Sequence, residues 1–326
     1  MIPRRLGTKL KEMAKKFPAI AITGPRQSGK TTLARALFPE KPYISLEELD
    51  VQNEARKDPR GFLSEYSSGA ILDEVQRVPA LLSYLQTALD QSSKTGLFIL
   101  TGSQHFLMME GISQTLAGRV YLSHLFPFSM AELSNQKLRT RSLEQTLFAG
   151  FYPRLYDKKI APADWYPSYV QTYLEKDVRA LKNVHDLRTF QQFLKMCAAR
   201  AGQLLNVSSL ANDCGISHHT AKAWLSILEA SFILYFLRPH HVNFNKRLVK
   251  MPKLYFYDTG LACSLLGIKN ENELAIHSMK GALFETFVIS ELMKFRFNGG
   301  NSEPYHFWRD KMGREVDCLA ERSGGV

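Results

Sequence analysis

Cysteine is scarce in this chain of 326 residues, and the few cysteines stand far apart. The four are Cys197, Cys214, Cys263 and Cys318, and no two of them form a C-x-x-C pair. This spacing argues against a disulfide framework and against a cysteine-based zinc site, and it favours a reducing compartment.

Long apolar runs are also missing. The longest unbroken run extends from Phe232 to Leu237, far short of the roughly 20 residues that cross a bilayer. The basic N-terminus, Met1 to Arg5, is not followed by the apolar core of a signal peptide. We therefore predict a cytoplasmic protein with no membrane partner.

Acidic residues are outnumbered by basic ones, 31 Asp and Glu against 42 Lys and Arg, which gives a net charge of +11. Such a charge favours an anionic partner such as a nucleic acid, although a solvated basic surface or bound phosphates would account for it equally well. The length predicts two or three domains.

One stretch near the N-terminus fits the phosphate-binding pattern G-x-x-x-x-G-K-[ST] in full. It reads Gly24, Pro25, Arg26, Gln27, Ser28, Gly29, Lys30 and Thr31, and Thr32 follows it. An apolar run at 19–22 and helix formers at 32–37 predict the strand, loop and helix that the motif needs. The loop N–H groups and the helix N-terminus would hold the phosphates of ATP. Lys30 would reach the β- and γ-phosphates, and the Thr31 hydroxyl would ligate Mg²⁺.

A second apolar run ends in two acids, Asp73 and Glu74. This pattern predicts that Asp73 belongs to the Mg²⁺ shell and that Glu74 orients or deprotonates the attacking water. A strand ending in two solvated acids would look the same, but the phosphate-binding motif upstream favours the functional interpretation.

A third apolar run, Leu97 to Leu100, is followed by polar residues. Either Thr101 or Ser103 could sense the γ-phosphate and position the water, and we take Ser103 as the candidate. Arg119 is a candidate arginine finger, acting in its own subunit or on a neighbour's nucleotide; a structural ion pair is the alternative.

Capping-box patterns predict two helix starts, at Ser45 with Glu48 and at Ser129 with Glu132. Residues 207–228 predict a helix-turn-helix, with Ser217 as the N-cap of the second helix. The exposed start of that helix would show residues able to meet phosphates or base edges: His218, His219, Lys222 and Ser226. Paired strands at 232–237 and 253–257 would flank a basic wing, which contains Lys246, Arg247 and Lys250.

The order of these motifs resembles one prokaryotic family of AAA+ ATPases. The resemblance is carried by the phosphate-binding motif, Ile-Leu-Asp-Glu at 71–74, Leu-Thr-Gly-Ser-Gln at 100–104 and Leu-Ala-Gly-Arg-Val at 116–120. It implies an α/β fold with a parallel five-stranded sheet, in which an inserted strand separates the two phosphate-contacting strands. A mainly helical winged-helix domain and a nuclease-like domain of unknown function would follow. The predicted domains are 1–135 (AAA+), 136–188 (helical lid and linker), 189–268 (winged helix) and 269–326 (nuclease-like).

The last of these domains resembles the opening of a PD-(D/E)xK restriction-nuclease-like α/β core. Glu285 lies on a predicted helix, and Asp317 lies in the second strand of a predicted hairpin. No Glu-x-Lys follows before Val326, so we expect an incomplete domain and no nuclease activity from this chain.

Together these features predict a Mg²⁺-dependent ATPase that couples ATP to action on double-stranded DNA or on a DNA-bound partner. The alternative is a slow nucleotide-dependent switch that binds a protein partner and no nucleic acid. The sequence leaves the oligomeric state open, with a homo-oligomer among the options.

Overall fold

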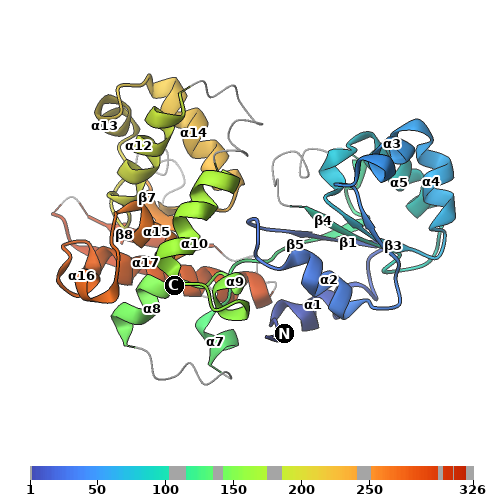
Figure 1. The fold of residues 1–326 in the computed structure, drawn as a ribbon, viewed down its shortest axis with the longest axis horizontal. Helices are drawn as coiled ribbons and strands as arrows, with labels where there is room; N and C mark the ends of the chain where they lie inside the picture. The colour runs from blue at the N-terminus through green and yellow to red at the C-terminus, as the bar shows by residue number, and fades with distance from the viewer. Residues whose placement is uncertain are drawn as a thin grey trace. The chain divides into compact units, whose positions relative to one another are not determined.

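The computed structural model describes residues 2–102, 115–134, 142–174, 186–240, 251–299, 304–310 and 312–320. The chain forms two compact units. Unit 1 is Met1–Phe126 with Phe297–Gly300, and unit 2 is Pro127–Arg296 with Asn301–Val326 (Figure 1). Within the described ranges, no helix combines the length and the apolar character that a membrane span requires.

Unit 1 is built on a parallel five-stranded sheet with the strand order β2-β3-β4-β1-β5. The strands are β1 (Ala19–Thr23), β2 (Tyr43–Ser45), β3 (Ala70–Asp73), β4 (Phe98–Gly102) and β5 (Val120–His124). β4 thus lies between β1, which precedes the phosphate-binding loop, and β3, which carries Asp73. The predicted parallel α/β sheet with its inserted strand is confirmed.

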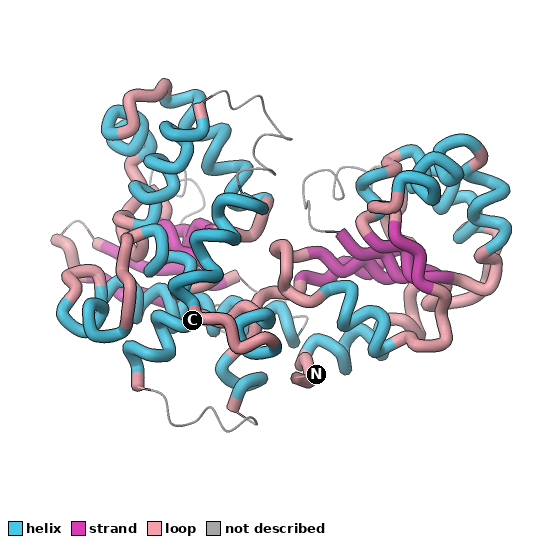
Figure 2. Tube along the Cα trace, in the orientation of Figure 1, coloured by secondary structure: helices cyan, strands magenta, loops and turns pink. Residues whose placement is uncertain are grey.

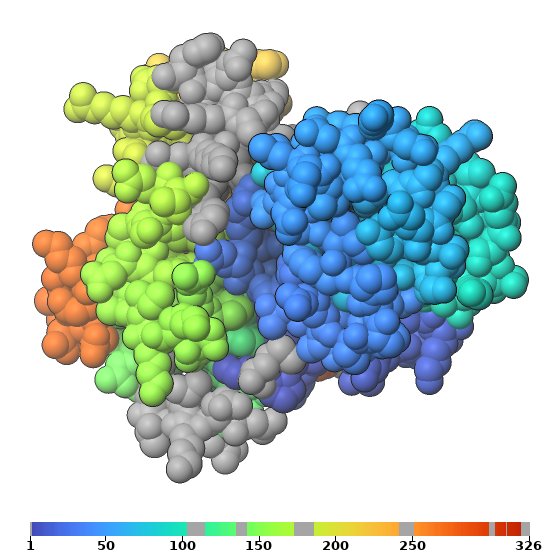
Figure 3. All heavy atoms as spheres, turned by 45° about the vertical axis from the view of Figure 1, so that its right-hand side comes forward, coloured from blue at the N-terminus to red at the C-terminus, as the bar shows by residue number. Residues whose placement is uncertain are grey.

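Helices cover both faces of this sheet (Figure 2). α1 (Leu6–Met13) and α2 (Lys30–Leu37) pack on one face, and α3 (Leu49–Lys57), α4 (Pro59–Glu65) and α5 (Ala80–Asp90) pack on the other. Because the central strands β1, β3 and β4 are buried on both faces, their sequences are mostly apolar rather than alternating. In the space-filling view, the mid-blue side chains of α3 and α4 form a continuous outer face of unit 1 (Figure 3).

One of the two predicted capping boxes is wrong. Ser45 is the last residue of β2 and pairs with Asp73, while α3 begins at Leu49 without a side-chain cap. The box at Ser129 and Glu132 is confirmed at the start of α7 (Met130–Leu133).

Unit 2 is mainly helical and has one large hydrophobic core. After α7 the helices among its described residues are α8 (Leu143–Ala149), α9 (Pro153–Asp157), α10 (Pro162–Tyr169), the π-helical η2 (Val170–Leu174), α12 (Leu187–Ala198), α13 (Val207–Asp213), α14 (His218–Ala230), α15 (Thr259–Leu265), α16 (Glu271–Ile276) and α17 (Lys280–Gly299). Buried side chains from Leu147 to Leu283 form a single cluster. The regions predicted as lid, winged helix and start of the nuclease-like domain therefore share this core.

A four-stranded sheet with the order β7-β6-β8-β9 completes unit 2. β6 (Leu234–Pro239) pairs antiparallel with β7 (Lys253–Phe256), and β8 (Tyr305–Arg309) pairs antiparallel with β9 (Glu315–Ala320), as predicted. The parallel pairing of β6 with β8, through Arg238 and His306, was not predicted. One sheet thus joins the predicted winged-helix and nuclease-like regions, and their boundary stays a prediction.

Candidate nucleotide-binding site

The predicted phosphate-binding loop connects β1 to α2, which begins at Lys30. Gly24 has φ of 147°, and a Cβ at this position would lie 2.1 Å from the Leu125 carbonyl oxygen, so only glycine fits. The Arg4 guanidinium braces the loop by donating to the carbonyl oxygens of Ser28 (2.8 Å) and Phe126 (2.5 Å). The sequence analysis identified Arg4 only as part of the basic N-terminus and missed this contact.

The side chains of the loop fit a phosphate ligand. Lys30 is 6% exposed, and its ammonium folds back over the loop, where it donates to the carbonyl oxygens of Gly24 (3.1 Å) and Pro25 (2.9 Å). The Ser28 hydroxyl and the Gln27 side-chain oxygen are buried and make no hydrogen bond within the described residues. Since a buried hydroxyl without an acceptor is costly, a phosphate oxygen at the loop would supply the acceptor that Ser28 lacks. Arg26 is half-buried and Thr32 is exposed.

Three hydroxyl groups from three elements converge on the carboxylate of Asp73, which is 7% exposed. Thr31 Oγ1 lies 3.1 Å from Oδ1 and 3.0 Å from Oδ2. Tyr43 Oη donates to Oδ2 over 2.8 Å, and Thr101 Oγ1 donates to Oδ1. The predicted pair of Thr31 and Asp73 is therefore brought together, whereas Tyr43 was not singled out.

This arrangement fits a Mg²⁺ ion by the chemistry of its donors. A threonine hydroxyl that donates its hydrogen to Asp73 keeps both lone pairs for a cation, and hydroxyl and carboxylate oxygens are ligands that Mg²⁺ accepts. Thr31 and Asp73 are the residues that would hold it.

Thr101 is the residue of β4 that contacts the site. It is fully buried at the end of the strand, next to β3. The sequence left Thr101 and Ser103 open as alternatives; Ser103 lies outside the described residues, and its role stays a prediction.

Glu74 follows Asp73 with φ of 54° and ψ of 44°, in the left-handed region. A short 3₁₀ turn, Val75–Arg77, comes next, and the Gln76 side-chain amide donates to Glu74 Oε2. Gln76 is 5% exposed, and its own Oε1 is buried without a hydrogen-bond partner in the described structure. Sequence reasoning missed Gln76, because nothing in a lone glutamine marks such a contact.

Arg119 immediately precedes β5, and its carbonyl oxygen accepts a hydrogen bond from Ala19 N. It therefore lies at the N-terminal ends of β1 and β5, whereas the phosphate-binding loop follows the C-terminal end of β1. Its guanidinium makes a two-pronged ion pair with Asp90, at 2.5 Å from Oδ1 and 2.9 Å from Oδ2. A hydrogen bond from Arg119 lowers the pKa of Asp90. The structure thus favours the ion pair over a finger within the same subunit; contact with a neighbour's nucleotide stays a prediction.

The predicted helix-turn-helix residues lie on α13 and α14. Ser217 caps α14 by accepting from Thr220 N (3.0 Å), as predicted, and Ala221, Trp224, Leu225 and Leu228 are buried. The predicted outward-facing residues His218, His219, Lys222 and Ser226 are all exposed. The predicted wing residues Lys246, Arg247 and Lys250 lie outside the described residues.

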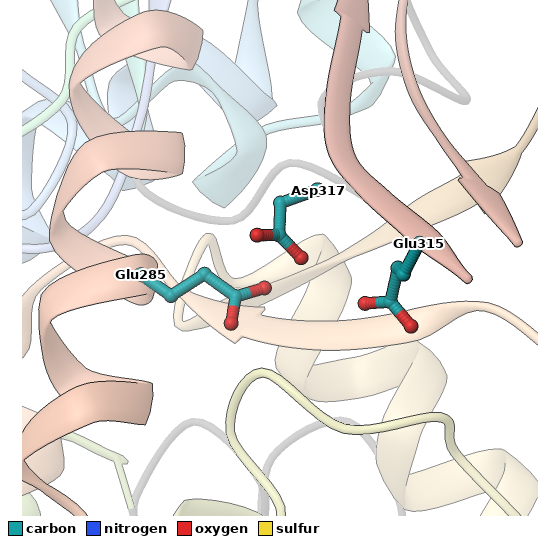
Figure 4. Close-up of side chains that lie close together, drawn as sticks. All are labelled: Glu285, Glu315 and Asp317. Atoms are coloured by element: carbon teal, nitrogen blue, oxygen red, sulfur yellow. The ribbon is translucent and has the colours of Figure 1, made fainter. Parts of the chain in front are cut away.

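A second cluster of charged side chains lies in unit 2. Figure 4 shows Glu285 extending from α17, and Glu315 and Asp317 from β9, with their carboxylates facing a common space. The Lys253 ammonium on β7 lies among them, 2.8 Å from Glu285 Oε1 and 2.8 Å from Asp317 Oδ1, and it also pairs with Glu315. Although burial lowers it, these three partners raise the pKa of Lys253 above its ordinary value.

The sequence predicted that Glu285 and Asp317 belong to one remnant site, and the structure brings them together. It adds Lys253, which comes from β7, a segment that no local pattern connects to the other two. Glu315 lies two residues before Asp317 in the predicted Glu-Val-Asp strand. The absence of nuclease activity stays a prediction.

The five-stranded sheet with its inserted β4, together with the loop that ends in Lys30 and Thr31, defines a P-loop ATPase of the AAA+ class. A family model described as an AAA domain matches residues 16–134. Two further models, described as domains of unknown function (DUF8612 and DUF4143), match residues 140–272 and 280–326.

Relatives of known sequence extend over nearly the whole chain. Uncharacterized proteins of Mycobacterium tuberculosis and Mycobacterium bovis are each 30% identical over 326 residues, which covers 99% of this chain and 72% of their own length. The chain belongs to the family of AAA-domain P-loop proteins that includes these mycobacterial proteins. Among solved structures, the Walker-type ATPase of Pyrococcus abyssi is 17% identical, with a TM-score of 0.51 over 81% of this chain and 96% of that one, and this likeness shows a shared fold.

Proposed function

We propose that this protein binds ATP with Mg²⁺, hydrolyses it, and couples hydrolysis to action on DNA or on a DNA-bound partner. The observation that carries the proposal is the meeting of Thr31 and Asp73 beside a loop whose Lys30 ammonium and Ser28 hydroxyl are buried. These groups supply a cation-binding pair and phosphate-binding donors within one site.

Each residue of the site has a role in this proposal. Lys30 exchanges the carbonyl oxygens of its own loop for phosphate oxygens, and the N-terminus of α2 adds its partial positive charge. Bound Mg²⁺ would neutralise charge on the phosphate oxygens. Glu74 orients the attacking water or takes its proton. Thr101, which donates a hydrogen bond to Asp73, would respond to the nucleotide bound at the same site.

Two observations support DNA as the partner. The exposed start of α14 presents imidazole, ammonium and hydroxyl groups, which can meet phosphates or base edges. The chain also carries a net charge of +11, which favours polyanions. The alternative, a slow switch that binds a protein, would use the same site without a polyanion.

Two substitutions test the ATPase proposal. Lys30→Ala removes the ammonium that would face the phosphates, and we expect binding of a fluorescent ATP analogue to fall by about a hundredfold or more. Glu74→Gln keeps the shape of the side chain but not its basicity, so binding should persist while phosphate release slows by roughly 10²–10⁴-fold.

Glu47→Gln is a matched control, because Glu47 is an exposed acid of the same unit that pairs only loosely with Arg77 (3.7 Å). It should leave binding and turnover unchanged. Normal turnover in Glu74→Gln would show that another residue activates the water.

A further inference from the structure

The Asp73 carboxylate has one partner that no motif accounts for. Thr31 belongs to the phosphate-binding motif and Thr101 to β4, whose end was predicted to contact the γ-phosphate, but Tyr43 comes from β2, at the edge of the sheet. Its hydroxyl lies 2.8 Å from Asp73 Oδ2.

The sheet register explains how Tyr43 reaches this position. β2 runs parallel to β3, with Ser45 opposite Asp73 and Tyr43 opposite Ile71. Tyr43 therefore starts two residues short of Asp73, an offset of about 6.6 Å along the strand, and a phenol side chain is long enough to bridge it. The Arg35 guanidinium lies 4.8 Å from the centre of the Tyr43 ring and holds the ring from the side of α2.

The Tyr43 hydroxyl is a dependable donor. A tyrosine hydroxyl carries its proton at neutral pH, and here it donates that proton to Asp73 Oδ2 over 2.8 Å. Thr101 holds Oδ1 while Tyr43 holds Oδ2. Because each oxygen has its own donor, the carboxylate plane is fixed and its remaining lone pairs point in set directions.

We propose that Tyr43 is a positioning residue, which orients Asp73 for the Mg²⁺ that accompanies the nucleotide. The inference rests on the proposed function and adds a residue to it. Partners that orient a ligand contribute substantially to metal affinity, since their loss typically weakens it by 10–100-fold.

The test is Tyr43→Phe, which removes one oxygen and keeps the ring under Arg35. Binding of a fluorescent ATP analogue is measured against Mg²⁺ concentration and, separately, in EDTA. We expect the Mg²⁺ concentration for half-maximal binding to rise about tenfold, while the affinity in EDTA is unchanged. Tyr66→Phe is the matched control: Tyr66 is a half-buried tyrosine of unit 1 whose ring packs edge-on against Phe62 at 5.3 Å, and its loss should change neither quantity.

Two results would overturn the inference. A wild-type Mg²⁺ dependence in Tyr43→Phe would show that the hydroxyl does not orient Asp73. An equal loss of nucleotide affinity with Mg²⁺ and in EDTA would show that Tyr43 affects binding through packing alone and not through the Mg²⁺ site. Failure of the proposed function is a distinct outcome, because the unsubstituted protein would then bind no nucleotide under either condition.

Discussion

Glu74 is held in a conformation that its own side chain does not prefer. Left-handed backbone angles at a residue other than glycine cost of order 1–3 kcal/mol and persist only where the surroundings impose them. Here the end of β3 and the 3₁₀ turn at Val75–Arg77 impose them, and the turn brings the Gln76 amide onto the Glu74 carboxylate. The strained backbone is therefore that of Glu74, the residue proposed to orient or deprotonate the attacking water.

The Gln76 contact makes a prediction about turnover. Gln76→Leu removes the amide that restrains Glu74, so we expect kcat for ATP to fall about tenfold with little change in KM, because a loosely held base is less often aligned. Steady-state phosphate release measures both constants. Stability should change little, since leucine also removes the buried Oε1 that has no hydrogen-bond partner in the described structure. A kcat equal to that of the unsubstituted protein would contradict the role of Gln76.

The sequence predicted the part of the site that lies in continuous motifs. The loop from Gly24 to Thr31, and Asp73 at the end of its strand, were predicted because strand, turn and helix signals surround them. Tyr43 and Arg4 were missed, because their contacts depend on strand pairing and on chain packing over long separations. Local patterns carry no information on either.

At the scale of elements, the start of α15 depends on one buried acid. Asp258 caps this helix by accepting from Leu261 N (2.9 Å), and it also accepts from Phe151 N (2.7 Å) and Tyr166 Oη (2.7 Å). It is 2% exposed, and burial raises the pKa of its carboxyl. A Cβ at Gly150 would lie 2.0 Å from the same Tyr166 oxygen, so the segment before Phe151 must approach closely for the contacts to form.

Asp258→Ala should lower the free energy of unfolding by about 3 kcal/mol or more, because it removes a helix cap and leaves two buried backbone donors, Leu261 N and Phe151 N, without an acceptor. Asp186→Ala is the control: Asp186 caps α12 through Thr189 N at 3.0 Å but is exposed, and its loss should cost only about 1 kcal/mol. Urea unfolding of both variants measures the difference. An equal loss of unfolding free energy in the two variants would show that Asp258 stabilises the protein only as a helix cap.

Helix starts show where local prediction holds and where it fails. The pattern at Ser129 predicted α7 correctly, since both reciprocal hydrogen bonds of the capping box form there. The same pattern at Ser45 predicted a helix start wrongly, because Ser45 is the last residue of β2 and pairs with Asp73 of β3. Sheet formation outweighed a local signal worth about 1 kcal/mol.

At the scale of the whole molecule, the net positive charge leads to a testable prediction about the partner. If α14 contacts DNA phosphates, duplex DNA should raise the ATPase rate at low salt, and moderate salt should remove the effect, since affinity falls steeply with log salt. Lys222→Ala should weaken binding and reduce the salt slope by about one. Hydrolysis that ignores DNA at both salt concentrations would favour the protein-binding switch.

The division of the chain beyond residue 127 could be predicted only in part. The helices α13 and α14 and both pairs of strands could be predicted from local patterns. The shared core from Leu147 to Leu283 and the pairing of β6 with β8 could not. A sequence read segment by segment predicts separate domains wherever the pattern changes. Burial then decides which of those segments fold together.

The position of β1 in its sheet also has a consequence for biosynthesis. β1 emerges from the ribosome before its neighbours β4 and β5, which begin only at Phe98 and Val120. At roughly 5–20 residues per second, the strand that leads into the phosphate-binding loop waits several seconds for both. The loop therefore takes its final shape near the end of translation of Met1–Phe126, and the first binding of nucleotide to a nascent chain would mark that moment.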